Sequence, residues 1–300
     1  MNKLKTKINN NCRQKNILQR KDLLQQLVED IKKKRELAAI DNFFVLGQLK
    51  QVLNQNYRLA AKLNLLTVRS ADYKKIVKLA RARLRNDYGL FRTKRAPPFA
   101  TVASLVQEFK QSPSPELLNK IMQQHSSTAE RLPHYGQLYQ QLFSITSNPK
   151  TILDLGCGLN PFSILFMGCR LQAYYAYDLS PLEIESINQF LRIIKVKGKA
   201  RVGDIAKILL FPRADAAFLF KMTDILDQGQ GHKKTEEMLR KIPAKHIIIS
   251  FATVTMSSQH MRAPRRRWVE WLCRRLNYSF SIIEIPNEIF YVIKKPAAKL

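Results

Sequence analysis

Cysteine is scarce in this sequence, and long apolar runs are absent from it. The four cysteines among 300 residues form no C-x-x-C pair and no cluster with the five histidines. This spacing argues against a metal site and a disulfide framework, and it is typical of reduced thiols in a cytoplasmic protein. The start has no apolar signal-peptide core, and no apolar run approaches the length of a membrane span. We therefore expect neither a membrane segment nor a metal.

Acidic residues are also few. The sequence has 23 Asp and Glu against 51 Lys and Arg, a formal net charge of +28. Residues 1–100 contain 24 Lys and Arg against 7 Asp and Glu, so about +17 of this charge lies in the first third. Such an excess predicts a polyanionic partner, because neutralised phosphates release counterions. The alternative is a soluble basic protein without such a partner.

The basic first third reads as a helical region. Apolar periodicity predicts a helix over residues 21–37, one or two helices over 43–66 and a further helix over 71–90. On the last of these, four cations recur at spacings of 4, 3 and 4, which puts them on one helical face. They can follow an RNA backbone, or they can be a solubilising surface. The four are Lys74, Lys78, Arg81 and Arg85.

The ten glycines are few, and two of them mark the most informative stretch. Residues 151–155 form a short apolar run that predicts a buried strand, which ends at Gly156 and Gly158. Residues 159–167 then predict the opening of a helix, with Pro161 in a first turn that tolerates proline. A strand, a glycine turn and a helix N-terminus together form a nucleotide-binding corner.

An acidic residue sharpens this expectation. The second apolar run, residues 171–177, ends at Asp178, which lies 20 residues beyond Gly158. In such folds a carboxylate at this distance holds the two ribose hydroxyls. The alternative is an ordinary βαβ unit whose turn binds nothing. NAD is disfavoured, because Pro161 stands where the third glycine of G-x-G-x-x-G, or an alanine, would come.

Further along, strands and helices alternate. Short helices are expected over residues 102–109 and 115–124, and an amphipathic helix over 132–143; Glu130, three residues after Ser127, has the spacing of a capping box. The fold class is therefore α/β, a Rossmann-like and mostly parallel sheet with an antiparallel hairpin at its C-terminal edge, preceded by a helical N-terminal domain. We expect a basic helical RNA-binding domain over 1–97, a helical connection over 98–148 and a catalytic domain over 149–300. The later predicted strands are 200–202, 214–220 and 246–251, then a hairpin of 278–285 and 288–293, with helices at 182–194, 235–241 and 268–276.

Several segments, taken together in order, resemble one family, the aminoglycoside-resistance 16S rRNA (guanine-N7) methyltransferases or FmrO-like group, which are class I S-adenosyl-L-methionine (SAM) methyltransferases. The resemblance covers roughly residues 70 to 295. Its most specific parts are His125-Ser-Ser-Thr-Ala-Glu-Arg131 and Leu153-Asp-Leu-Gly-Cys-Gly-Leu-Asn-Pro161. The other matching stretches are 80–89, Asp178, 218–221, 250–253 and 287–293.

The resemblance implies a cofactor site for SAM. In that family the segment matching residues 125–131 lies against the methionine end of the cofactor, so Arg131 and Thr128 are expected to hold its carboxylate. Asp178 is expected to take the ribose, and Asp204 and Ile205 to flank the adenine. The complete expected cofactor set is His125, Thr128, Arg131, Asp154, Gly156, Gly158, Asn160, Asp178, Asp204 and Ile205.

The resemblance also implies the substrate and the chemistry. The expected partner is 16S rRNA within the small subunit, methylated by a monomer at the decoding site. Guanine N7 carries a free lone pair, so alignment rather than a general base is expected to drive the reaction. Lys221, Phe251 and Thr253 are the expected catalytic residues, with Phe251 able to stack on a flipped base. Arg262, Arg265 and Arg266 are expected to contact RNA, and Lys221 can also reach a phosphate.

Other readings remain open. Residues 254–264 contain no glycine, whereas the family has a glycine- and arginine-rich loop there, so a different target base or atom in RNA is one alternative. A ribosome-binding protein that keeps the SAM fold without turnover is another. A small-molecule methyltransferase is least favoured, because the charge of +28 would then have no role.

Overall fold

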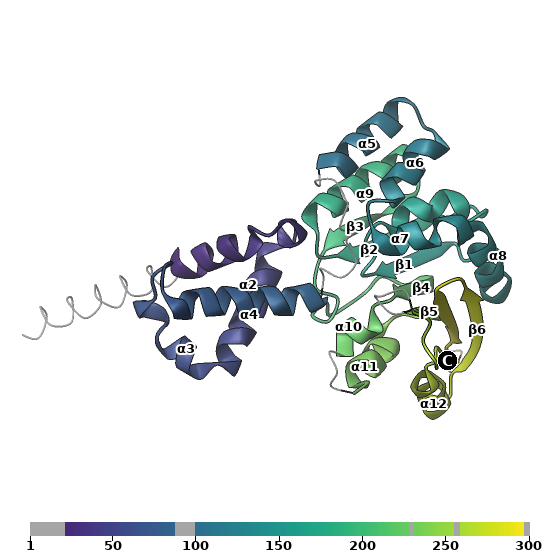
Figure 1. Cartoon of the computed structure of the whole chain (residues 1–300). Coiled ribbons are helices and arrows are strands. Elements are labelled where there is room, and N and C mark those ends of the chain that lie inside the picture. The colour runs from purple at the N-terminus through teal and green to yellow at the C-terminus, as the bar shows by residue number, and fades with distance from the viewer. Residues whose placement is uncertain (1–21, 88–99, 228–230, 255–258, 297–300) are drawn as a thin grey trace, which may run out of the picture. The chain divides into compact units, whose positions relative to one another are not determined.

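A computed structural model describes residues 22–87, 100–227, 231–254 and 259–296, and the chain divides into two compact units, Met1–Leu90 and Phe91–Leu300 (Figure 1). The end of the predicted 71–90 helix and residues 255–258 of the loop after the fifth strand lie outside the described residues. No helix within the described ranges has both the length and the apolar character needed to cross a membrane.

The first unit is helical, as predicted. Tyr73, Ile76, Ala80 and Leu84 form a buried stripe along its last helix, which packs against α2. Asp41 caps α2, because its side chain accepts a hydrogen bond from the backbone N–H of Phe44 at 2.9 Å. The elements are a helix over residues 22–32, η1 (Arg35–Leu37), α2 (Asn42–Gln55), α3 (Tyr57–Ala61), η2 (Leu63–Leu65) and α4 (Ala71–Asp87).

The second unit is built on a seven-stranded sheet of order β3-β2-β1-β4-β5-β7-β6. The first five strands are parallel, and β7 runs antiparallel between β5 and β6. The predicted fold class, a mostly parallel sheet with an antiparallel hairpin at its C-terminal edge, is therefore confirmed. The strands are β1 (Thr151–Leu155), β2 (Ala173–Asp178), β3 (Lys197–Val202), β4 (Ala214–Phe220), β5 (Ala244–Ala252), β6 (Ser279–Ile285) and β7 (Glu288–Lys294).

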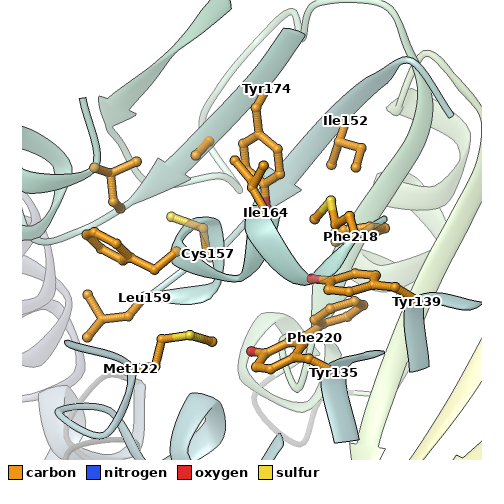
Figure 2. Close-up of a cluster of buried hydrophobic side chains, with 14 of the residues drawn as sticks. Met122, Tyr135, Tyr139, Ile152, Cys157, Leu159, Ile164, Tyr174, Phe218 and Phe220 are labelled. Carbon is orange, nitrogen blue, oxygen red and sulfur yellow. The ribbon is translucent and has the colours of Figure 1, made fainter. Parts of the chain in front are cut away.

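Helices cover both faces of the sheet, and β4 shows why. Its side chains alternate, so that Phe218 and Phe220 enter one apolar cluster and Leu219 enters the other. The first cluster, drawn in Figure 2, also contains Tyr135 and Tyr139. Its face carries α5 (Ala100–Gln111), α6 (Pro115–Met122), α8 (Tyr135–Thr146), η5 (Asn160–Phe166) and α9 (Pro181–Ile193), and the other face carries α10 (Thr223–Asp227), α11 (Lys233–Lys241) and α12 (Arg267–Arg275).

The segment over 159–167 is helical as predicted and takes the form of the 3-10 helix η5, with Pro161 in its first turn. One local prediction is wrong: the capping box at Ser127 and Glu130 is absent. The helix α7 (Ser126–Arg131) has His125 as its N-cap with no side-chain hydrogen bond, and a 3-10 turn, η4 (Leu132–His134), links it to α8.

Candidate active site

The glycine turn follows β1 directly and is tied to the end of β2. The backbone N–H groups of Gly156 and Cys157 both donate to the carbonyl of Tyr177, at 2.9 and 3.0 Å. Gly156 and Gly158 have φ values of +72° and +48°, a region that other L-residues rarely adopt. A Cβ atom on Gly156 would also overlap the side chain of Met222. The backbone conformation therefore favours glycine at position 156, and a side chain there would also have to displace that of Met222.

The structure brings Asp178 to this turn. One carboxylate oxygen, Oδ2, accepts the backbone N–H of Gly158 at 2.8 Å, and the other accepts that of Leu179 at 2.6 Å. A Cβ atom on Gly158 would lie 3.1 Å from Nε2 of His125, so His125 contacts the same turn from the side of α7. Three groups that the sequence keeps far apart thus meet at the carboxyl end of the first two strands.

Asp154 and Asn160 are buried next to the turn. The Asp154 carboxylate accepts hydrogen bonds from the Asn160 side-chain amide at 2.9 Å and from the Tyr174 hydroxyl at 2.6 Å. The amide oxygen of Asn160 in turn accepts the hydroxyl of Tyr135 at 2.9 Å. Burial raises the pKa of Asp154 to about 6. These bonds connect β1, β2, η5 and α8, so the two side chains hold the turn in shape.

Thr128 is also engaged within the protein. Its hydroxyl lies within hydrogen-bond distance of two backbone carbonyls, those of Met122 and His125. The single hydroxyl proton is therefore used to tie α7 to the end of α6. This contact holds His125 and Arg131 at the two ends of α7 in place.

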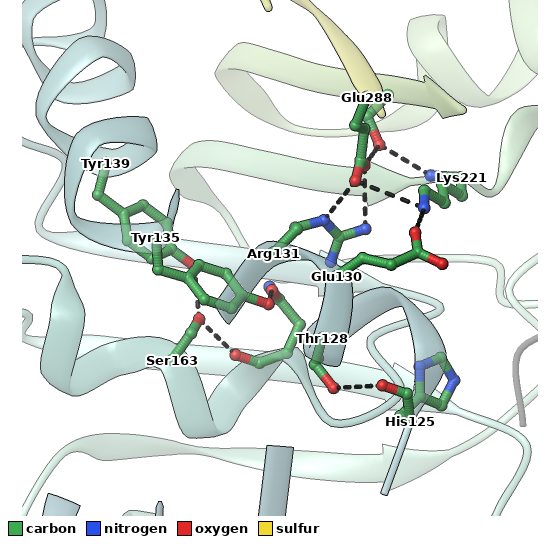
Figure 3. A network of polar contacts seen from close by, with 11 residues as sticks. His125, Thr128, Glu130, Arg131, Tyr135, Tyr139, Ser163, Lys221 and Glu288 are labelled. Atoms are coloured by element: carbon green, nitrogen blue, oxygen red, sulfur yellow. Dashed lines mark hydrogen bonds and ion pairs between the residues drawn. The ribbon is translucent and has the colours of Figure 1, made fainter. Parts of the chain in front are cut away.

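Arg131 forms a buried, two-point ion pair with Glu288. Its Nε and Nη2 atoms donate to the two carboxylate oxygens at 2.8 and 3.0 Å, and both side chains are 2% exposed (Figure 3). The guanidinium also lies over the ring of Phe220, 4.9 Å from its centroid. Burial by itself would raise the pKa of Glu288, but the charges of Arg131 and Lys221 hold that pKa below its ordinary value. The carboxylate is therefore anionic.

Lys221 joins the same network from the end of β4. Its Nζ lies 2.7 Å from a carboxylate oxygen of Glu130 and 3.6 Å from one of Glu288. Its backbone adopts φ of +57°, held by the N–H bond to the hydroxyl of Ser250 at 3.0 Å. The Ser250 hydroxyl in turn donates to Glu288. Figure 3 shows how two cations and two carboxylates from α7, β4 and β7 converge here.

Glu288 was not predicted from the sequence as a site residue. It opens a strand that is otherwise apolar, Ile289 to Ile293, and lies 157 positions from Arg131. An acidic side chain at the start of a buried strand is itself a signal, since such a charge must find a partner. Its partner cannot be read from local spacing.

Asp204 and Ile205 follow the third strand, as expected. Ile205 is buried in the second apolar cluster. The Asp204 carboxylate accepts the backbone N–H of Ala206 at 3.1 Å and pairs with Lys207 at 3.1 Å.

Phe251 and Thr253 lie at the end of β5. Phe251 is 1% exposed, and its ring contacts Arg266, Trp268 and Tyr291. It therefore has no face open to a base, and the predicted stacking role does not fit this structure. Thr253 is partly exposed, and its backbone is hydrogen-bonded to Asn287 and Met261.

The arginines of the following segment differ in what they contact. Arg266 is partly buried and held by the backbone: its guanidinium donates to the carbonyls of Pro264 and Ala252. Arg265 pairs with Glu270 at 2.8 Å, and Arg262 is exposed. The other four expected RNA contacts, Lys74, Lys78, Arg81 and Arg85, lie on α4 of the first unit.

The sheet order, the glycine turn after β1 and the carboxylate at the end of β2 define the class I methyltransferase fold. The model of one family, the ribosomal RNA methyltransferase (FmrO) family, matches residues 55–292. The chain belongs to this family, as its predicted resemblance indicated.

Individual relatives agree with this assignment. The chain is 28% identical over 240 residues to a 16S rRNA (guanine(1405)-N(7))-methyltransferase of Micromonospora echinospora, covering 77% of this chain and 86% of the relative. It is 30% identical over 190 residues to the enzyme of the same name from Proteus mirabilis, covering 60% and 66%. The crystal structure of the 16S rRNA methyltransferase RmtF in complex with S-adenosyl-L-homocysteine has a TM-score of 0.73 at 21% identity, covering 91% of this chain and 98% of that one.

Proposed function

We propose that this chain transfers the methyl group of SAM to N7 of a guanine in 16S rRNA, at the decoding site of the small ribosomal subunit. The family assignment and the names of the curated relatives support the reaction and the class of RNA. The observation that carries the proposal is the contact between Gly158 and Asp178 beside His125. We further propose that the enzyme acts as a cytoplasmic monomer and that this methylation confers aminoglycoside resistance.

The residues at the glycine turn fit a nucleoside cofactor. Gly156 and Gly158 carry no side chain and adopt positive φ, so the backbone of the turn can be approached closely by a ligand. Asp178 offers carboxylate oxygens at the end of β2, where a ribose diol needs acceptors. Asp204 and Ile205 would flank the base at the end of β3. Asp154 and Asn160 would support the turn from within the core.

Arg131 would hold the carboxylate of the cofactor. A guanidinium has five N–H groups, and Glu288 engages two of them. Tyr135 is a further partner of the guanidinium, and the N–H groups that remain would take the second carboxylate in the plane that Glu288 fixes. Glu288 would thus be a positioning residue, and Lys221, which shares it, would face the RNA side of the site.

The charge balance of the site suits methyl transfer to a nitrogen lone pair. Bound SAM would supply a sulfonium methyl group, which the free lone pair of N7 could accept as the carbon–sulfur bond breaks, without loss of a proton. The positive charge would then pass from sulfur to nitrogen without a change in net charge. Arg131 and Lys221 are balanced by Glu130 and Glu288, so the mouth of the site is close to neutral. The protein's role is to align the reactants rather than to abstract a proton.

Transfer of labelled methyl from SAM to purified small subunits, with naked 16S rRNA, large subunits and tRNA alongside, tests the proposal. Cleavage at N7-methylguanine followed by primer extension would then locate the base. Label on small subunits with cleavage at a decoding-site guanine is the expected result. Label at another base would move the target, and no label on any RNA despite SAM binding would overturn the rRNA assignment.

A further inference from the structure

A basic pocket lies within the first unit, between the helix over residues 22–32, the turn after it and α4. Its volume is about 480 Å³, within the usual range of about 300–1,000 Å³ for ligand pockets. Val68, Tyr73 and Val77 supply apolar wall. The charged side chains that line it are five cations and one carboxylate: Lys34, Lys74, Lys78, Arg81, Arg85 and Asp30.

The one carboxylate is already used. Asp30 accepts the Tyr73 hydroxyl at 2.6 Å and pairs with Lys33 at 2.5 Å, a lysine that does not line the pocket. The hydrogen bonds from Lys33 and Tyr73 lower the pKa of Asp30, so it stays anionic and committed to these two partners. It therefore does little to offset the pocket's positive charge.

The cations fall into three kinds. Arg81 is fixed, because its guanidinium donates to the backbone carbonyls of Asp30 and Ile31, which carry no charge to neutralise it. Arg85 is paired with Glu36 at 2.8 Å. Lys34, Lys74 and Lys78 are exposed, and no described residue forms a hydrogen bond or ion pair with any of these three ammonium groups. The four predicted cations are therefore not equivalent, and with Lys34 the pocket has one fixed guanidinium, one paired guanidinium and three lysines without a partner among the described residues.

We infer that this pocket binds a single phosphate of an RNA backbone. Arg81 would present its charge from a fixed position, Lys74 and Lys78 would close on the phosphate oxygens, and the adjoining sugar would lie against Val68 and Val77. This site would fix the register of the RNA on the first unit, which a flat cationic surface would not do. The inference rests on the proposed function for the identity of the RNA, but not for the binding of phosphate.

Lysine acetylation followed by mass spectrometry tests the inference on the full chain. The matched control is Lys75, an exposed lysine on the same helix that does not line the pocket. Addition of small ribosomal subunits should lower the acetylation rate of Lys74 and Lys78 by about fivefold or more and leave that of Lys75 within about twofold. Equal protection of all three lysines would indicate diffuse attraction and would overturn the pocket, as would protection of none.

Charge-removing variants give an independent measurement. The double variant Lys74→Gln/Lys78→Gln should weaken 16S rRNA binding about tenfold or more and reduce the slope of log affinity against log salt by about 1–2. Lys75→Gln should change affinity by less than about twofold. Inorganic pyrophosphate, used as a probe without RNA, should protect Lys74 and Lys78 in the wild type. Equal effects of the pocket and control variants would contradict the inference.

Methyl transfer measured on the same samples separates this inference from the proposed function. Methylation of 16S rRNA without selective protection of Lys74 and Lys78 would overturn the pocket alone. Selective protection by RNA and by pyrophosphate, with no methylation of any RNA, would overturn the proposed function and support the pocket.

Discussion

The cations of the candidate active site and those of the pocket in the first unit differ in their partners. In the second unit Arg131 is buried and Lys221 nearly so, and each is paired with a carboxylate. In the first unit Lys74 and Lys78 line a pocket and have no such partner among the described residues. A buried cation needs a counter-charge, because desolvation is expensive, whereas an exposed one can remain free for a polyanion. A buried cation paired with a carboxylate therefore suits a positioning role, and an exposed cation without such a partner suits the binding of a polyanion.

Removal of the carboxylate that pairs with the buried arginine should give the largest loss of stability. Glu288→Ala leaves Arg131 buried without its carboxylate, and we expect the free energy of unfolding to fall by about 3–5 kcal/mol. Denaturant unfolding monitored by circular dichroism measures this. A loss below about 1 kcal/mol would show that water or another group replaces the carboxylate and would break the comparison.

A third kind of charge, Asp154, is buried with neutral partners, and its ionisation should weaken the fold. Its pKa is raised from 3.8 to about 6, so the native state holds more protons than the unfolded state between these values. Its contribution to stability is therefore present below about pH 4 and is lost as the pH rises through 6. Relative to that of the wild type, the free energy of unfolding of Asp154→Asn should rise by on the order of 2–3 kcal/mol between pH 4 and pH 7. Urea titrations at several pH values measure the difference, and a pH-independent difference would refute the assignment.

Substitution of glycine by alanine can be compared at two positions with different backbone conformations and surroundings. Gly156→Ala puts a side chain at φ of +72° against Met222, and we expect a loss of about 1–2 kcal/mol together with loss of SAM binding. Gly136→Ala, within α8 and with open space around it, should instead stabilise by roughly 0.5–1 kcal/mol. Thermal unfolding and calorimetric titration with SAM measure both. If both variants change the free energy of unfolding and SAM binding equally, the glycine turn after β1 is not conformationally constrained.

The smallest effect on folding is expected in the pocket. Lys74→Gln and Lys78→Gln should each change the free energy of unfolding by no more than about 0.5 kcal/mol, since neither ammonium group has a partner among the residues that the structure describes. The same denaturant experiment provides the measurement. A larger loss would mean that these lysines hold the first unit together and would remove their contrast with Arg131.

Local patterns predicted the sheet better than the site. The bounds of β1 and β4 match the prediction, since short apolar runs between turn residues have few other solutions. The spacing from Gly158 placed Asp178 at the end of the second strand, as the structure has it, and parallel neighbouring strands bring the two residues into contact. The pairing of Arg131 with Glu288 was beyond local reasoning, because it depends on the insertion of β7 beside β5. The burial of Phe251 likewise depends on Trp268 and Tyr291, which come later in the chain.

The position of Glu288 also has a consequence for synthesis. A ribosome makes Arg131 long before it makes the first residue of β7, and chains grow from the N-terminus. Until that strand emerges and pairs with β5, the arginine has no counter-charge and the site is incomplete. With the positioning role proposed for Glu288, the cofactor site of a nascent chain is complete only once the C-terminal hairpin has been released and folded.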